Sequence, residues 1–451
     1  MTLGCLMVDT GLLFHVTRDH IFKNDKLFYR FEEDEPSHGK TVRDESGQNI
    51  SLWKKYSEAF SGGINFESSK NNISRVPGLP SQDLGVNISD MEQLMENIPP
   101  VDEHNTHLLD NVHPSPWVQP GDPNIKERFY NLVVLGGGTA GLVSSIGSQS
   151  VGAKVALIES HFLGGDCTNF GCVPSKILIK SAKVAKMMRN SSEFGIEVDG
   201  SVNVNFPKIM ERLRRVRSEI SDFEAAERLA KLGIDVYMGK GMFDSPNSIV
   251  VDGLRLVFGK CIICTGGSAL VPPLPGLDQV KYLTNESLFN LTTLPPRFAV
   301  MGTGPIGTEM AQCFQRFGSD TTMIGRSERI LGKEDLEAAD ITKKSLEEDG
   351  MKFALGFTTT KISQGEDGVI AIEGTLKNGE SVTVHADALM VSTGRRPRVR
   401  NFGLEAANVE YNHTAGVLVN DQMRTSNPNI FAAGDCCSRY QFTHMAGNMT
   451  L

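Results

Sequence analysis

Hydrophobic and polar residues follow two different patterns along the chain, and the change comes near residue 129. Residues 1–128 are rich in Ser, Asn, Asp, Glu and Pro, contain few periodic apolar segments, and end in a proline-rich stretch. This pattern is typical of a poorly ordered extension followed by a linker. We therefore expect both tryptophans, Trp53 and Trp117, to be solvent-exposed. From Phe129 onward, short apolar runs alternate with helical patterns and glycine-rich turns, which predicts a parallel α/β sheet.

The α/β region contains one supersecondary unit twice. In each copy, an apolar strand leads into a glycine-rich turn, a helical stretch and a second strand, and a later strand ends in Thr-Gly. The copies occupy residues 131–159 with 261–267, and residues 297–324 with 389–394. Such a repeat predicts two Rossmann-like nucleotide-binding domains, each with three layers around a central parallel sheet.

The glycine-rich turn of the first copy contains Gly136, Gly138 and Gly141 in the pattern G-x-G-x-x-G. Between a strand and a helix, such glycines allow a tight turn, the close approach of a pyrophosphate, and close packing of the helix. The helix N-terminus then faces the phosphates. Glu159, at the end of the next strand, can accept hydrogen bonds from ribose hydroxyls. We expect a dinucleotide site here.

The second copy repeats the turn with Gly302, Gly304 and Gly307, but lacks the acidic residue. Gly325 holds the equivalent position and is followed by Arg326. A carboxylate there would repel a ribose 2′-phosphate, whereas a guanidinium can bind one. The second copy therefore favours NADPH over NADH. The alternative interpretation is that Arg326 and the nearby Arg329 only solvate a loop.

Cys167 and Cys172 follow the first copy in the segment GGDCTNFGCVPSK. Cysteines at this spacing can lie one turn apart at a helix start, close enough to form a disulfide, and a helix N-terminus stabilises a thiolate. Spacing alone also allows two buried cysteines in a loop. Beside two dinucleotide sites, the pair suggests an electron path from hydride donor through flavin to disulfide.

From about Phe129 to Leu451 the sequence resembles the class I pyridine nucleotide-disulfide oxidoreductases. The cysteine segment matches the family's glycine pair, C-x4-C and Pro-Ser-Lys, although Thr168 stands where the family usually has an aliphatic residue. Residues 429–435, NIFAAGD, resemble its second flavin motif. Residues 211–237 are similar to a long helix and strand of the mercuric reductase-like branch. The basic cluster in that helix is expected to be a solvated face and comprises Arg212, Arg214, Arg215 and Arg217.

This resemblance implies that residues 129–277 and 397–451 form an FAD domain, and residues 278–396 a domain for NADPH or, less favourably, NADH. Electrons would pass from NADPH through FAD to the cysteine pair, and on to a small disulfide or metal-ion substrate. Cys172 would face the flavin, Cys167 would meet the substrate, and Lys176 would pair with Glu309 beside the flavin. The other implied cofactor contacts are Gly165, Asp166, Gly241, Thr265, Gly266 and Asp435 for FAD, and Gly394 for the pyridine nucleotide.

The remaining cysteines near the motifs give a weaker signal. Cys261 and Cys264 have metal-type spacing, but they lie in a strand run without a second pair, so we expect a buried core. Cys436 and Cys437 follow the flavin Asp directly, and we expect them to be structural. No resident metal site is predicted.

The resemblance also bears on the end of the chain. Family members form homodimers through a C-terminal domain that supplies a His-Glu acid/base pair to the partner's site, whereas here only 16 residues follow Asp435. We expect this dimerisation domain to be absent. The alternatives to the NADPH-linked reductase are a truncated, non-catalytic flavin-binding protein and an NAD-linked dihydrolipoamide dehydrogenase-type enzyme.

Composition narrows the range of partners. The 45 Lys plus Arg against 54 Asp plus Glu give a net charge of −9, which does not favour nucleic acid or anionic lipid. The mean hydropathy is −0.18, and no apolar run reaches the length of a membrane span. Because no basic residue precedes the first apolar run, we expect no secretory signal. We expect a cytoplasmic, intracellular protein, and organelle import stays open.

Overall fold

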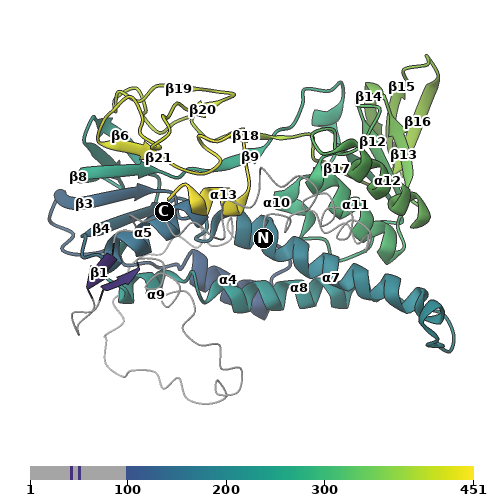
Figure 1. The fold of residues 1–451 in the computed structure, drawn as a ribbon, viewed down its shortest axis with the longest axis horizontal. Helices are drawn as coiled ribbons and strands as arrows, with labels where there is room; N and C mark the ends of the chain where they lie inside the picture. The colour runs from purple at the N-terminus through teal and green to yellow at the C-terminus, as the bar shows by residue number, and fades with distance from the viewer. Residues whose placement is uncertain (1–40, 44–48, 52–97, 451) are drawn as a thin grey trace. The chain divides into compact units, whose positions relative to one another are not determined.

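The computed structural model describes residues 41–43, 49–51 and 98–450 (Figure 1). Strands β1 (Thr41–Arg43) and β2 (Asn49–Ser51) pair antiparallel with each other. Trp53 lies outside the described residues. Everything that follows concerns residues 98–450.

The first large sheet contains the strands of the first sequence copy. Its order is β5-β4-β3-β8-β7-β6, and β21 pairs with β8. Strands β3, β4, β5, β8 and β21 run parallel to one another, while β7 is antiparallel to β6 and β8. The bounds are β3 (Glu127–Leu135), β4 (Val155–Glu159), β5 (Ile234–Met238), β6 (Met242–Ser245), β7 (Ser248–Val251), β8 (Leu254–Ile263) and β21 (Ile430–Ala432).

Side chains alternate between the two faces of this sheet along each strand, and packing buries both faces. Leu132 and Val134 of β3 pack with residues of α4, α5 and α9. Val133 and Leu135 pack on the other face, with apolar side chains from residues 399–417. The helices are α4 (Glu103–Val112), α5 (Thr139–Ser150) and α9 (Ala226–Lys231), and residues 399–417 include β19 (Tyr411–Asn412) and β20 (Gly416–Val417).

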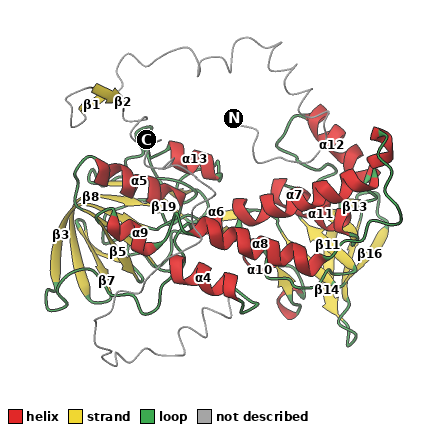
Figure 2. Cartoon of the chain, turned by 90° about the horizontal axis from the view of Figure 1, so that it is seen from below, coloured by secondary structure: helices red, strands yellow, loops and turns green. Residues whose placement is uncertain are grey.

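The second large sheet contains the strands of the second copy and is entirely parallel, in the order β10-β17-β11-β12-β13. Phe298 and Val300 of β11 pack toward α7, α8 and α11, which lie side by side in Figure 2. Ala299 and Met301 pack toward the antiparallel sheet β14-β15-β16. The predicted α/β class with two Rossmann-like units is therefore confirmed.

The elements of this second unit have the following bounds. The strands are β10 (Tyr282–Leu283), β11 (Arg297–Met301), β12 (Asp320–Gly325), β13 (Lys352–Leu355), β14 (Thr358–Gln364), β15 (Ile370–Thr375), β16 (Ser381–Ala386) and β17 (Ala388–Val391). The helices packed on it are α7 (Cys172–Arg189), α8 (Phe206–Ser221), α11 (Pro305–Phe317) and α12 (Leu336–Glu348).

The remaining elements of the two units are short. They are α6 (Gly165–Phe170), η2 (Ser191–Phe194), β9 (Gly267–Ala269), η3 (Leu277–Gln279), α10 (Asn285–Leu288), β18 (Arg395–Pro397) and α13 (Thr443–Asn448). Strands β9 and β18 pair antiparallel and lie between the two large sheets in Figure 1.

Residues 98–128 correct the expectation of an irregular extension to residue 128. This segment contains α4, which is N-capped by the Asp102 side chain and packs on α8, and it continues into β3. The indole N–H of Trp117 donates to the Val236 carbonyl at 3.0 Å, and the ring packs against the first core. Trp117 is partly buried, so its expected exposure is wrong.

A buried guanidinium fastens α4 to the rest of the unit. Arg217 of α8 is fully buried, and its Nη1 and Nη2 donate to the Asn169 carbonyl at 2.9 Å and to Asn105 Oδ1 at 2.8 Å. Burial lowers the pKa of Arg217 to about 10. Arg214 is also buried and pairs with Asp102. The solvated face expected for the basic cluster is therefore wrong for these two arginines, whereas Arg212 and Arg215 are exposed.

We expect Arg217→Met to lower the free energy of unfolding by about 2–4 kcal/mol, because two buried oxygens lose their donor. Arg215→Met is the matched control on the same helix. Arg215 forms an exposed ion pair with Glu219, so its replacement should cost less than about 0.5 kcal/mol. Thermal unfolding measures both. Equal effects of the two variants would contradict the role given to Arg217.

Candidate active site

One cavity gathers most of the predicted site residues. Its lining includes the predicted residues Gly136, Gly138, Glu159, Gly165, Asp166, Cys167, Cys172, Lys176, Gly241, Thr265, Gly266, Glu309 and Asp435. The predicted residues outside this lining are Gly141, Gly302, Gly304, Gly307, Arg326 and Gly394. Residues from the first sheet, α6, α7 and α11 therefore share one space.

The two glycine-rich turns begin with glycines under the same steric constraint. Gly136 has φ +110°, and a Cβ there would lie 2.3 Å from the Cys264 carbonyl oxygen. Gly302 has φ +122°, and a Cβ there would lie 2.3 Å from the Ser392 carbonyl oxygen. In each unit the turn therefore packs on the strand that ends in Thr-Gly. The repeat seen in the sequence is also a repeat in geometry.

The later glycines of each turn serve packing and access. A Cβ on Gly141 would lie 1.8 Å from the Gly136 carbonyl oxygen, so this glycine allows α5 to pack against its own turn. Gly138 and Gly304 are the N-caps of α5 and α11, and neither helix has a side-chain cap. A Cβ on Gly304 would meet nothing within 4 Å. Both helix N-termini are therefore accessible to an anionic group.

Glu159 is held at the cavity edge by backbone donors. Its carboxylate accepts hydrogen bonds from the Gly137 N–H at 2.6 Å and the His161 N–H at 2.7 Å. Burial raises the pKa of Glu159, and these hydrogen bonds act in the opposite direction. The carboxylate thus lies directly beside the first glycine-rich turn.

Cys167 and Cys172 are both partly exposed and lie on two consecutive helices, α6 and α7. A hydrogen bond with the Cys172 sulfur, followed by burial, raises the pKa of Cys167. Cys172 is the first residue of α7, where the helix dipole favours negative charge. The Thr443 hydroxyl lies 3.2 Å from its Sγ. This arrangement favours Cys172 as the thiol that holds the negative charge.

Lys176 lies one turn beyond Cys172 on α7 and reaches Glu309 on α11. Its Nζ donates to both carboxylate oxygens of Glu309 at 3.0 Å. The Glu309 side chain is buried, whereas Lys176 is partly exposed to the cavity. The predicted pair therefore connects the helix that begins at Cys172 to the helix that begins at the second glycine-rich turn.

Glu224, which sequence reasoning missed, lies beneath the cysteine segment. Its carboxylate accepts a hydrogen bond from the Thr168 hydroxyl at 2.6 Å, while Oε2 is buried and has no hydrogen-bond partner among the residues that the structure describes. Burial raises the pKa of Glu224 to about 7, and its charge contributes to the raised pKa of Cys167. A hydroxyl at residue 168, in place of the usual aliphatic side chain, thus has a polar partner in Glu224.

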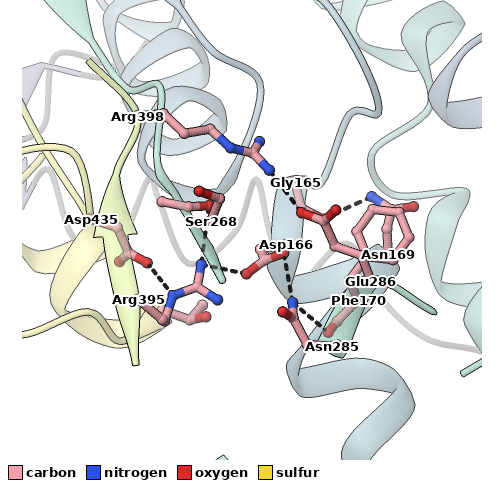
Figure 3. A network of polar contacts seen from close by, with 12 residues as sticks. Gly165, Asp166, Asn169, Phe170, Ser268, Asn285, Glu286, Arg395, Arg398 and Asp435 are labelled. Atoms are coloured by element: carbon pink, nitrogen blue, oxygen red, sulfur yellow. Dashed lines mark hydrogen bonds and ion pairs between the residues drawn. The ribbon is translucent and has the colours of Figure 1, made fainter. Parts of the chain in front are cut away.

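Arg395 was also missed, although it directly follows Gly394. Its guanidinium lies in the lining of the cavity and contacts the carboxylates of Asp166 and Asp435 (Figure 3). The adjacent Thr-Gly motif gave no signal for this contact, because both partners are distant in sequence.

Arg326, which we expect to lie near the second glycine-rich turn, does not line the cavity. Arg326 is exposed just beyond β12. A Cβ on Gly325 would lie 2.4 Å from Thr303 Cγ2, so close packing against the turn also explains the missing acidic residue. Arg329 Nη2 donates to the carbonyls of Gly332 and Glu334. Arg326 therefore remains the candidate for contact with a ribose phosphate.

The family model described as pyridine nucleotide-disulphide oxidoreductase matches residues 130–450. The chain belongs to this family. It is 33% identical over 317 residues to a mercuric reductase of Bacillus cereus, covering 70% of this chain and 50% of that protein. It is also 33% identical over 323 residues to a dihydrolipoyl dehydrogenase of Acholeplasma laidlawii, covering 71% and 93% of the two chains. The chain thus spans about half the length of the Bacillus mercuric reductase.

Among solved structures, the fold is similar to the HOCl-induced flavoprotein disulfide reductase RclA from Escherichia coli. The TM-score is 0.63 at 28% sequence identity, and the match covers 71% of this chain and 69% of that one. A Cu(II) complex of the same protein matches equally well. In the described ranges of our chain, no helix is long and apolar enough to cross a membrane.

Membership of the pyridine nucleotide-disulphide oxidoreductase family implies FAD and a pyridine nucleotide. The residues of the cavity fit FAD. A Cβ on Gly138 would meet no atom closer than 3.7 Å, so a phosphate can approach the uncapped N-terminus of α5. Both thiols and Asp435 line the same cavity, which also extends along the N-terminal half of α11.

We expect the stability gained from replacing Glu224 to depend on pH. The pKa of Glu224 is raised from 4.5 to about 7. The contribution of this side chain to the free energy of unfolding is therefore full below pH 4.5 and is lost as pH rises through 7. Glu224→Gln cannot ionise, so it should gain about 2 kcal/mol more over wild type at pH 8 than at pH 5. Unfolding at both pH values measures this difference.

Glu219→Gln provides the control for loss of an exposed carboxylate, since the Glu219 side chain is 59% exposed. It should change stability by less than about 0.5 kcal/mol at either pH. An effect of Glu224→Gln that is identical at pH 5 and pH 8 would contradict the raised pKa.

Proposed function

We propose that this protein is an FAD-dependent oxidoreductase that passes electrons from NADPH to the Cys167–Cys172 pair and on to a small disulfide or metal-ion substrate. One observation supports this above all: the two thiols and the Lys176–Glu309 pair line the same cavity as the first glycine-rich turn. Helix α11 begins at the second glycine-rich turn and borders that cavity through Glu309 and Met310. Helix α11 thus leads from the second turn to the cavity that holds the dithiol, which supports a pyridine nucleotide at that turn as the hydride donor.

The proposed FAD domain comprises residues 129–277 and 397–451, joined by residues 98–128, and the pyridine nucleotide domain comprises residues 278–396. When bound, FAD supplies two-electron transfer between a nicotinamide and a disulfide. The proposed FAD contacts are Gly136, Gly138, Gly141, Glu159, Gly165, Asp166, Lys176, Gly241, Thr265, Gly266 and Asp435. The proposed NADPH contacts are Gly302, Gly304, Gly307, Glu309, Arg326 and Gly394.

In this proposal, Lys176, Cys167 and Cys172 have different roles in the reaction. Lys176, oriented by Glu309, places a cation where negative charge develops beside the flavin ring. Cys167 attacks one sulfur of a substrate disulfide, which breaks the S–S bond and releases one thiolate. Cys172 then attacks the Cys167 sulfur, releases the second thiol and closes the protein disulfide. Because the pKa of Cys167 is raised, the first attack requires removal of its proton.

A metal ion is the other substrate class that we propose. Thiolates are the ligands that soft metal ions prefer, and the same two sulfurs can coordinate such an ion in the cavity. The named mercuric reductases among the relatives favour this chemistry, while the dihydrolipoyl dehydrogenases favour a disulfide. An NAD-linked lipoamide dehydrogenase-type enzyme is therefore the main competing function. Arg326, next to a glycine in place of an acid, favours NADPH.

The direct test is an assay of the purified protein with its flavin spectrum. We expect a yellow protein that oxidises NADPH in the presence of Hg(II), oxidised glutathione or lipoamide, and that loses this turnover in Cys167→Ser. A colourless protein that cannot be loaded with FAD, or NADPH oxidation that is unchanged in Cys167→Ser, would contradict the proposed function.

The assignment of Cys172 as the flavin-side thiol predicts a spectroscopic signature. On addition of one equivalent of NADPH, a long-wavelength charge-transfer band should form, because a Cys172 thiolate would lie against oxidised flavin. Cys172→Ser should abolish the band, and Cys167→Ser should leave a stable one. Absorption spectra of the two matched variants separate these roles. A band that is the same in both variants would contradict the assigned pair.

Cofactor choice is tested at Arg326. Arg326→Ala should weaken NADPH binding by about 1–3 kcal/mol, the cost of losing a charge-assisted hydrogen bond, and should spare NADH. Arg329→Ala is the matched control, since the Arg329 guanidinium donates to backbone carbonyls. Calorimetric titration with both nucleotides measures the effects. Equal losses for NADPH and NADH would exclude a 2′-phosphate contact.

A further inference from the structure

Arg395 joins two carboxylates in the wall of the flavin cavity (Figure 3). Its Nη2 lies 2.5 Å from Asp166 Oδ2, and its Nε lies 3.2 Å from Asp435 Oδ2. Nη2 also donates to the Gly267 carbonyl at 3.3 Å, on the strand that pairs with β18. The Arg395 side chain is only 12% exposed. This guanidinium therefore connects the cysteine helix α6 to the loop that follows β21.

Carboxylates outnumber cations in the lining of this cavity. The acidic residues of the lining are Glu159, Asp166, Glu309 and Asp435, and its Lys and Arg residues are Lys176, Arg395 and Arg398. Lys176 contacts Glu309, and Arg398 Nη2 donates to Glu286 at 2.9 Å. Within the described lining, Arg395 is thus the cation that neutralises Asp166 and Asp435 together.

Asp166 lies close to the expected position of an anionic group. The uncapped N-terminus of α5 begins at Gly138, and such a terminus attracts phosphate. Gly165, the neighbour of Asp166, packs so closely on this turn that a Cβ there would lie 2.7 Å from the Gly138 Cα. An uncompensated carboxylate beside a pyrophosphate would oppose its binding, especially in a partly buried site of reduced dielectric.

The two carboxylates also affect each other. Burial raises the pKa of Asp435, the charge of Arg395 lowers it, and the charge of Asp166 raises it. Loss of Arg395 would therefore leave two mutually repelling carboxylates in the wall. Asn285 contributes one neutral contact to this network, because its Nδ2 donates to Asp166 Oδ1 at 3.2 Å. A neutral amide cannot replace the missing positive charge.

We propose that Arg395 is a positioning residue that sets the affinity of this cavity for FAD, by neutralising Asp166 beside the cofactor's pyrophosphate and holding Asp435 in place. The inference rests on the proposed flavin function and adds a residue to it. Its particular claim is that the need for Arg395 arises from Asp166. Removing the charges of Arg395 and Asp166 together should therefore restore the FAD affinity that is lost when Arg395 alone is removed.

The test is an FAD titration of the full-length apoprotein, followed by flavin fluorescence at fixed ionic strength. Arg395→Met should weaken FAD binding roughly tenfold or more, because it leaves two partly buried carboxylates unpaired. Asp166→Asn alone should improve the affinity, because it removes a negative charge beside the expected pyrophosphate. The double variant Asp166→Asn/Arg395→Met should recover most of the loss. Arg396→Met is the matched control, since Arg396 lies on the same strand but is exposed, and it should stay within about twofold of wild type.

Three outcomes would overturn the inference. The first is an Arg395→Met affinity equal to wild type, and the second is an equal loss in Arg396→Met. The third is a folded double variant that binds FAD as weakly as Arg395→Met, which would mean that Asp166 is not what Arg395 neutralises. If Arg395→Met does not fold by circular dichroism, the double variant decides: recovered folding and affinity support the inference, and a folded double variant without affinity overturns it. A wild-type protein that binds no FAD would instead contradict the proposed function.

Discussion

Helix α7 begins at the cavity and packs in the core of the second unit, and the arrangement of the site depends on this double placement. Its first residue, Cys172, lines the cavity of the first unit, while Ile177, Leu178 and Ala182 pack in the core beneath the second sheet. The helix therefore cannot shift relative to the second unit without moving the thiol. The Lys176–Glu309 pair lies between these two parts of the helix and connects it to α11. Packing and ion pairing together fix the distance between the dithiol and the second glycine-rich turn.

Three charged residues contact the segment that carries the two cysteines. Arg217 bonds to the carbonyl of Asn169, which lies between the two cysteines, and it also holds α4. Glu224 bonds to Thr168 in the same short helix. Arg395 contacts Asp166, one residue before Cys167. The cysteine segment is thus surrounded by largely buried polar groups. Arg217 and Arg395 are costly to remove, because their partners would be left unsatisfied.

The sequence was most informative where the constraint is local. The glycines of the two turns are required by steric contacts within a strand, a turn and a helix, so a short pattern suffices to predict them. The pairing of Lys176 with Glu309 spans 133 residues and was predicted only through the family resemblance. Arg395 contacts Asp435 across 40 residues and Glu224 contacts Thr168 across 56, and no periodic pattern marks either residue. Long-range contacts of single polar side chains leave no local signal.

The segment 98–128 escaped prediction for a related reason. Apolar side chains of α4 pack in the first core, but Trp117 and Gln119 dock through single contacts to the backbone of Val236 and Met238, and such contacts have no period. The basic cluster of α8 was misinterpreted because an arginine is normally exposed on a helix, and only a partner such as Asn105 makes burial acceptable. The structure of residues 98–128 and the burial of these arginines thus depend on tertiary contacts.

The central claim is that the dithiol exchanges electrons with a flavin bound in the same cavity. An anaerobic titration of the FAD-loaded protein with dithionite tests it most directly, by counting the electrons taken up per flavin and the thiols formed. The account predicts uptake of four electrons per flavin, two by the flavin and two by the Cys167–Cys172 disulfide, with two new thiols for each disulfide reduced. Complete reduction after only two electrons, with no new thiols in a protein whose cysteine pair was first oxidised, would contradict it.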